Sequence, residues 1–156
     1  MYLLLKLLHV IAVIAFLGNI TTGLFWHAHV ARSGDPRLLA NVMRGIIRSD
    51  QIFTMPGVIG IIVSGVATAM LGGFPILGTG WIFWTLVLFA ISGVVFAIQV
   101  APLQKRLLAL AEQAVPSQHF DEREYRALAL RWEIWGALSL ATPFAGLALM
   151  VLKPAL

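Results

Sequence analysis

The residue best placed for chemistry is His9, which lies in a long apolar segment near the start of the chain. An ionisable side chain inside such a segment is costly, so its presence points to a function. Neutral imidazole is a common ligand of metal ions and of haem iron. Lys6 lies three positions earlier, about one helical turn away on the same side. His9 is therefore a candidate metal or haem ligand, and the alternative is an imidazole that hydrogen-bonds a neighbouring helix.

The other three histidines are weaker candidates. His27 and His29 lie two positions apart, so on a helix they point in different directions, which predicts an interfacial, solvated pair. His27 follows His9 by five helical turns, about 27 Å, so the two cannot hold one ion or one haem. His119 lies among charged residues and is predicted to be exposed. The later apolar segments contain no histidine, which excludes the bis-histidine site of a b-type cytochrome.

A haem on His9 would therefore have an open sixth position or a different second ligand. Met70 and Met150 are predicted at a similar depth and carry thioether sulfurs. The chain contains no phosphate-binding loop, nucleophile elbow or zinc-protease helix. It contains no cysteine, which excludes thiolate catalysis, disulfides and iron–sulfur clusters. The sequence does not decide whether the protein is an enzyme.

The composition points to a membrane. Hydrophobic residues make up 60% of the 156 positions and charged residues 12%, against about 25% charged in soluble domains. This excludes an ordinary soluble domain and a disordered chain. The net charge is +4, but the basic residues are too few to follow a phosphate backbone, so no nucleic-acid partner is expected. The expected partner is the lipid bilayer.

The charges leave three long stretches free: 25 positions after Lys6, 54 positions from Gln51 to Gln104, and 19 positions before Lys153. A helix needs about 20 apolar residues to cross a bilayer. The middle stretch has room for two spans, separated by a glycine-rich turn at residues 72–80. We expect an all-α four-helix transmembrane bundle, a single integral membrane domain over residues 1–156. Its spans are predicted near 4–30, 52–71, 81–103 and 132–152.

Lysine and arginine counts predict the orientation. The first charged loop contains four of these residues and the second contains five, whereas the glycine-rich hairpin contains none. Cytoplasmic loops are the ones enriched in Lys and Arg. The N-terminus and the C-terminus are therefore predicted to lie outside, in a multi-pass protein of the bacterial inner membrane. Trp26, Trp132 and Trp135 are expected at the cytoplasmic interface, and Trp81 and Trp84 at the outer one.

The charged loops show helical signals. Residues 36–49 are amphipathic, which predicts an interfacial basic helix or an extension of the first span. Asp121 with Glu124 three positions later resembles a capping box, so the fourth helix is expected to begin before its membrane portion. Asp50 is predicted to cap the second helix. Glu133 is predicted to pair with an arginine, within a structural network that includes Arg131 and Gln99.

Small residues follow one side of each predicted span, where they let helices approach closely in lipid. Pro56 and Pro143 are expected to kink or unwind their helices locally. The residues predicted to pack in this way are Gly18, Thr22, Gly57, Gly60, Ser64, Thr68, Gly93, Ala97, Gly136, Ser139 and Gly146.

Several short segments resemble a known superfamily. Lys6-Leu7-Leu8-His9-Val10 looks like the start of the first helix in HemJ-type protoporphyrinogen oxidases and their copper-resistance-D-like relatives. Thr54-Met55-Pro56-Gly57-Val58 resembles the Thr-Pro-Gly opening of their second helix. Arg131-Trp132-Glu133 and Lys153-Pro154 extend the resemblance over most of the chain, in short patches. The chain looks most like a branch described as predicted integral membrane proteins.

In HemJ-type proteins the first-helix histidine is implicated in binding haem b, and a lysine lies beside it. The resemblance therefore implies that His9 and Lys6 contact a haem. That family has basic or histidine residues in its third helix, where this chain reads Trp81-Ile82-Phe83-Trp84-Thr85-Leu86. The departure argues against protoporphyrinogen oxidation and leaves haem binding open.

Two hypotheses follow. In the first, the protein is a small haem-b-binding redox protein with His9 as axial ligand and Lys6 paired with a propionate; its electron-transfer partner is not indicated. In the second, it is a non-enzymatic membrane protein that transports a metal or small solute or assists complex assembly. His9 and nearby methionines would then be soft metal ligands. Four spans are few for a transporter, so a homodimer would be expected.

Overall fold

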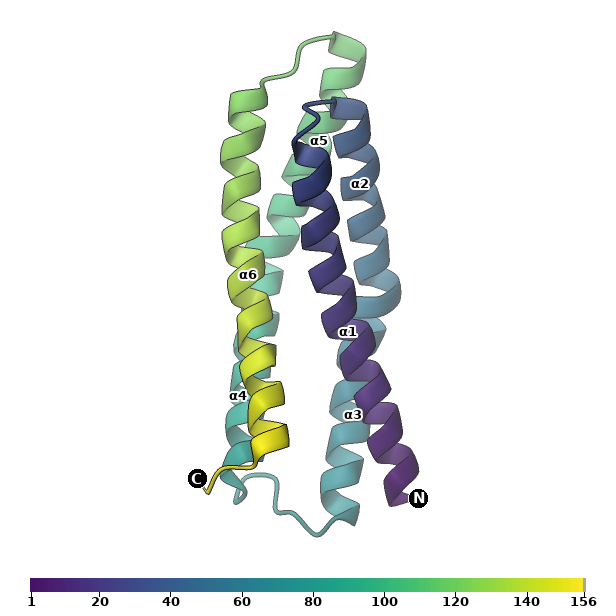
Figure 1. The fold of residues 1–156 in the computed structure, drawn as a ribbon, viewed down its shortest axis with the longest axis vertical. Helices are drawn as coiled ribbons and strands as arrows, with labels where there is room; N and C mark the ends of the chain where they lie inside the picture. The colour runs from purple at the N-terminus through teal and green to yellow at the C-terminus, as the bar shows by residue number, and fades with distance from the viewer. Residues whose placement is uncertain (156) are drawn as a thin grey trace.

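The computed structural model describes residues 1–155, which form helices joined by short connections and include no strand. Four long helical segments run side by side in alternating directions (Figure 1). Both termini lie at the same end as the hairpin between the second and third segments. Each of the four segments is long and apolar enough to cross a membrane, which confirms the predicted all-α bundle.

The four segments differ in their internal structure. The first and last are single α-helices, whereas the second and third each contain a short π-helical stretch, labelled η. In chain order the elements are α1 (Tyr2–Ala31), α2 (Pro36–Ser49), η1 (Asp50–Thr54), α3 (Met55–Leu71), α4 (Gly80–Val95), η2 (Phe96–Val100), α5 (Ala101–Ser117) and α6 (Glu122–Leu152).

Each π-helical stretch lies just before a proline, Pro56 after η1 and Pro102 after η2. Proline has no N–H to donate, and its ring crowds the carbonyl of the preceding turn. A wider π-helical turn accommodates this mismatch without ending the helix. The local unwinding predicted at Pro56 therefore takes the form of a π-helical turn. Pro143 lies inside the unbroken α6.

The amphipathic segment at residues 36–49 is α2, and both predictions for it are wrong. Asp35 caps α2 by accepting a hydrogen bond from the Arg37 backbone N–H, and the helix continues through η1 into the second span. Its apolar face, which includes Leu39 and Met43, packs mainly against α5. Because protein covers this face, it has no need of a membrane surface.

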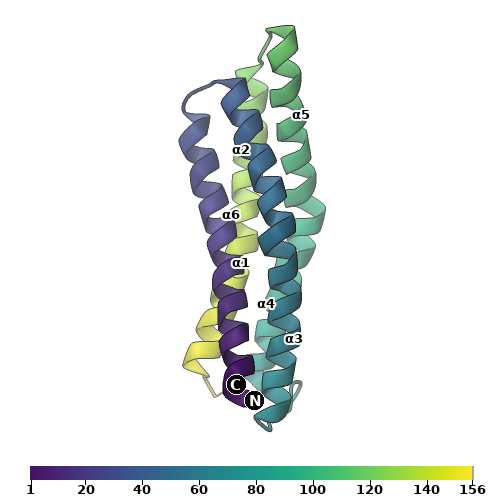
Figure 2. The same ribbon diagram turned by 90° about the vertical axis from the view of Figure 1, so that its right-hand side faces the viewer.

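The buried core lies in one half of the bundle. This charged half consists of α2, α5, the C-terminal half of α1 and the N-terminal half of α6, and Figure 2 shows α2 and α5 side by side there. Trp132 belongs to this core, so its predicted place in an interfacial belt is wrong. The core residues are Leu39, Ala40, Met43, Ile46, Val100, Leu103, Leu107, Ala111, Tyr125, Ala129 and Trp132.

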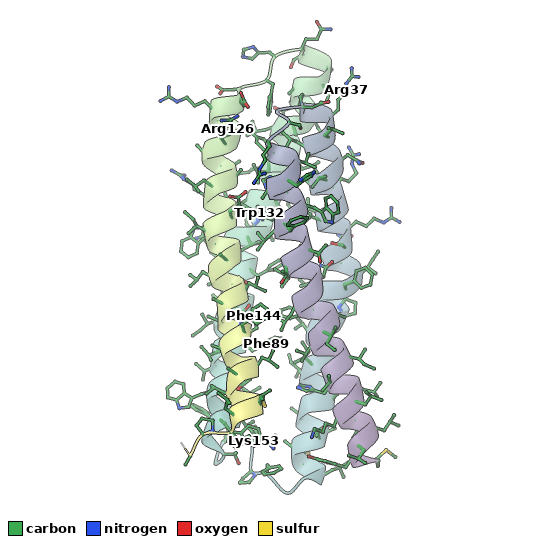
Figure 3. The ribbon with its side chains drawn as sticks, viewed as in Figure 1. Arg37, Phe89, Arg126, Trp132, Phe144 and Lys153 are labelled. Carbon is green, nitrogen blue, oxygen red and sulfur yellow. The ribbon has the colours of Figure 1, made fainter. Side chains whose placement is uncertain are left out.

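The other half, the apolar half, presents hydrophobic side chains outward (Figure 3). It consists of α3, α4 and the remaining halves of α1 and α6. The helix from Asp50 to Leu71 is about 33 Å long, which is close to the hydrocarbon thickness of a bilayer. Lipid can cover these side chains, and the charged half then extends beyond it. Exposed examples are Leu3, Ile14, Ile59, Val63, Val94 and Val151.

Within the apolar half the helices associate as two pairs, α1 with α3 and α4 with α6. A Cβ atom at Gly60 would lie 3.3 Å from that of Ala12, so this glycine permits the close approach of α1 and α3. Between α4 and α6, the Ser92 hydroxyl donates to the Ser139 carbonyl at 2.6 Å. The packing predictions are thus confirmed at Gly60 and Ser139.

Five more of these predictions can be checked from neighbouring atoms. A Cβ at Gly57, Gly136 or Gly146 would meet α1 or α4 side chains within 3.4 Å. The predicted packing residues Gly18 and Gly93, however, have open space around them, with no neighbour within 4 Å.

The helix start predicted near Asp121 is confirmed. Its carboxylate accepts a hydrogen bond from the Glu124 backbone N–H at 2.9 Å, and α6 begins at Glu122, ten residues before the predicted span.

The absence of cysteine makes the orientation testable with single cysteines. Leu77→Cys lies in the exposed hairpin, and His119→Cys lies in the exposed connection between α5 and α6. In whole bacterial cells whose outer membrane has been permeabilised, a maleimide that cannot cross the inner membrane should label Leu77→Cys. It should label His119→Cys only after lysis, because Arg- and Lys-rich loops stay in the cytoplasm. The reverse pattern would overturn the predicted orientation.

Candidate ligand cavity and the polar clusters around it

A cavity of about 630 Å³ lies in the apolar half, within the usual size range of small-molecule sites. It forms because α3 makes no close contact with α4 or α6. Phe16 and Phe89 meet across the gap with ring centroids 5.5 Å apart, so an aromatic pair joins α1 to α4 (Figure 3 labels Phe89). Most of the walls are apolar; they include Val13, Ile62, Val66, Leu86 and Leu147.

His9 lines this cavity. Its Nδ1 lies 3.0 Å from the Ile61 carbonyl oxygen and 3.3 Å from the Ser64 hydroxyl. A carbonyl can only accept, so this contact favours the tautomer with the proton on Nδ1. Nε2 has no hydrogen-bond partner anywhere in residues 1–155. The predicted alternative, an imidazole bonded to a neighbouring helix, is thus present at one ring nitrogen and leaves the other free to act as a ligand.

Gly65 supports the His9 ring. A Cβ atom at this position would lie 3.0 Å from His9 Cε1 and 3.1 Å from Nδ1. These distances are shorter than normal van der Waals contact, so any side chain here would displace the imidazole. The glycine therefore allows α3 to approach the ring closely enough for the Ile61 contact.

Two lysines line the cavity near the chain termini, Lys6 as considered from the sequence and Lys153, which sequence reasoning missed. Lys153 ends α6 in the left-handed backbone conformation (φ 44°), and Figure 3 shows it at this end of the bundle. Its ammonium group lies 5.3 Å from the Trp81 ring centre and 5.9 Å from that of Phe74. The sequence feature that could have pointed to Lys153 is a single basic residue directly after an uncharged span.

The two methionines considered as sulfur ligands are placed differently. Met150 lines the cavity, whereas Met70 is 69% exposed and does not. Within the described part of the chain, no group of three His, Cys, Asp or Glu side chains could hold a metal ion. Any metal or haem in the cavity would therefore have His9 as its imidazole ligand, with Met150 as the nearby thioether.

His27 is fully buried, which overturns its predicted solvated position. Its Nδ1 lies 3.2 Å from a Glu133 carboxylate oxygen, and its Nε2 lies 3.2 Å from the Tyr125 hydroxyl. The Trp132 ring packs edge-on against it, with centroids 4.8 Å apart. The ion pair expected between Glu133 and an arginine is replaced by this contact to His27. His29 and His119 are exposed, as predicted.

Asp50 is not a helix cap, because it lies inside the continuous second segment as the first residue of η1. Its carboxylate accepts hydrogen bonds from the Asn19 amide at 3.0 Å and the Thr54 hydroxyl at 2.8 Å. The Gln104 amide donates to its other oxygen at 2.8 Å. The predicted network around Arg131 and Gln99 is thus replaced by a cluster of Asp50 with three neutral donors.

The sequence profile of a family described as predicted integral membrane protein (DUF2269) matches residues 3–154. The chain belongs to this family. No curated protein and no solved structure matches it. This membership confirms the resemblance to a branch of predicted integral membrane proteins. It also agrees with the four helices that are long and apolar enough to cross a membrane. Kinship of this DUF2269 protein with HemJ-type or copper-resistance-D-like proteins stays a prediction.

In this DUF2269 protein, His27→Ala should destabilise the fold. The substitution leaves Tyr125 and Glu133 without their partner, and a buried polar group without a partner costs about 1–3 kcal/mol. The free energy of unfolding, measured in increasing denaturing detergent by circular dichroism, should fall by at least this amount. The exposed His29→Ala should change it by less than about 0.5 kcal/mol. Equal effects of the two variants would contradict the buried cluster.

Proposed function

We propose that the protein binds haem b in the cavity of the apolar half, with His9 Nε2 as the axial ligand. The observation that carries the proposal is the arrangement of His9, whose Nδ1 bonds the Ile61 carbonyl while Nε2 is free at an apolar cavity. Ligating histidines typically donate their other ring N–H to such an acceptor, which fixes the ring and raises its basicity.

The cavity residues fit the rest of the cofactor. A porphyrin has a broad apolar face and two propionate carboxylates at one edge. The walls are largely aliphatic and aromatic, and Lys6 lies at the end near the termini, where it would pair with a propionate. Met150 also lines the cavity and would be the candidate sulfur ligand.

Bound haem supplies one-electron chemistry between ferric and ferrous iron. The chain's own part is to hold and shield the group. Ile61 and Gly65 fix the His9 ring, Phe16 and Phe89 close the cavity toward the charged half, and the bilayer excludes water. The resemblance around Lys6 and His9 supports this function. The proposal does not extend to protoporphyrinogen oxidation, because the third-helix segment lacks the basic or histidine residues of HemJ-type proteins.

The proposed setting is a bacterial inner membrane with both charged loops in the cytoplasm, on the basis of the Lys and Arg distribution. A homodimer and an electron-transfer partner remain predictions. Transport of a metal or small solute, or a role in complex assembly, is the alternative if the cavity takes no haem.

The optical spectrum tests the proposal directly. Wild-type protein purified from haem-supplied cells should show a Soret band that shifts on reduction with dithionite. His9→Ala should lose this band, because no other imidazole lines the cavity. His29→Ala, an exposed histidine at the other end of α1, should keep it. A colourless wild type, or a band unchanged in His9→Ala, would overturn haem binding on His9.

The support beneath the His9 ring gives a second test. Gly65→Ala should push the imidazole by a few tenths of an ångström from its present position. Strain of this kind in a side-chain torsion costs about 0.5–1.5 kcal/mol, which would weaken haem binding by up to about tenfold. Gly18→Ala, where a methyl group has open space, is the matched control. Haem affinity is measured by titrating apoprotein and following the Soret band. Equal affinities of the two variants would contradict the assigned position of His9.

A further inference from the structure

A second, much smaller pocket lies at the junction of the two halves. Its volume is about 20 Å³, enough for a single water molecule and too small for an organic ligand. Side chains from α1, α5 and α6 meet there with the first residue of η1. The polar ones are Asn19, Asp50, Gln104, Trp132 and Ser139.

Trp132, which lines this pocket, carries an unpaired donor. Its side chain is 2% exposed, and its indole Nε1–H has no hydrogen-bond partner in residues 1–155. Buried polar groups in folded proteins are nearly always paired, so an orphan donor points to an acceptor that occupies the pocket. An acceptor of this size is a water oxygen. A metal cation would be repelled by the N–H group.

Asp50 is the other unusual group at the pocket. It is 7% exposed, and the side chains that bond it are neutral: Asn19 from α1, Thr54 from η1 and Gln104 from α5. From α6 it is faced by Trp132 and Ser139, and Asp50 is the only titratable residue in the pocket lining. Loss of solvent favours the protonated carboxyl group, whereas the three donors favour the carboxylate. Burial and hydrogen bonding thus act in opposite directions on the protonation of Asp50.

The backbone around the pocket is also irregular. Asp50 begins η1, and η2 contributes Phe96 and Val100 to the same pocket. π-helical turns inside long helices are frequent at functional sites, because they re-aim side chains and loosen the carbonyl pattern. Here one such turn contains the buried carboxyl group and the other lines the same pocket.

We propose that Asp50 is a proton-binding site, served by one water molecule that accepts from Trp132 Nε1–H and donates to the carboxylate. In the binding step the carboxylate takes up one proton, delivered from bulk water through the bound water, and becomes a carboxylic acid. Release reverses the step. Ionisable residues buried in membrane proteins commonly form such proton sites. This inference does not depend on haem binding.

Infrared difference spectroscopy of the full chain in lipid nanodiscs tests the proposal. Spectra taken at acidic and alkaline pH should show the C=O stretching band of a solvent-shielded carboxylic acid. Asp50→Asn should abolish that band while keeping the size and shape of the side chain. Trp132→Phe should shift its frequency, because the water loses its donor. Trp135→Phe, a partly buried tryptophan outside the pocket lining, should leave the band unchanged.

A measurement on wild-type protein guards against misfolded variants. With ¹⁵N-labelled tryptophan, the indole N–H signal that Trp132→Phe removes should receive magnetisation from water, as a donor to a bound water does. A carboxylic acid band that persists in Asp50→Asn would overturn the proton site. An indole signal without transfer from water, or equal bands in Trp132→Phe and Trp135→Phe, would overturn the water.

Discussion

Apolar side chains gain nothing by leaving a lipid environment for each other, and this constraint separates the two halves of the bundle. In the charged half, water drives Leu39, Met43 and Leu107 into a dense core that binds α2 to α5. In the apolar half only close contacts at small residues hold helices together, and they form within pairs. The two pairs are joined firmly at one end and stand apart at the other, and the cavity occupies the space between them.

Two buried polar clusters fix the register where the halves meet. His27 ties α1 to α6 through Tyr125 and Glu133, while Asp50 ties α1, η1 and α5 together. Hydrogen bonds have directions and narrow distance limits, which apolar contacts lack. A slip of one residue in any of these helices would leave a buried polar group unpaired. The clusters therefore determine which residues of α1, His9 among them, face the cavity.

Local patterns were enough for the helices and not for the contacts between them. Charge-free stretches of known length predict four spans, and Asp121 with Glu124 predicts the start of α6, because both signals depend on neighbours in sequence. His27 was misplaced because its burial depends on Tyr125 and Glu133, which lie 98 and 106 positions away. Asp50 was misread as a cap because its role depends on Asn19 and Gln104, which lie 31 and 54 positions away, and because a π-helical turn carries the helix through. His9 was singled out by its depth, its spacing from Lys6 and the resemblance around it, but its unpaired nitrogen and the place of Lys153 at the cavity emerged only with the tertiary structure.

The second and third segments are each one continuous helix that runs from the charged half into the apolar half. The two helices contain 36 and 38 residues and are about 54 and 57 Å long. Each has its π-helical turn where the charged half meets the apolar half. Each of these helices therefore joins the core of the charged half to a wall of the cavity without a break in the helix. The position of α3 and α4 at the cavity is thus set by the same helices that pack in the core through α2 and α5.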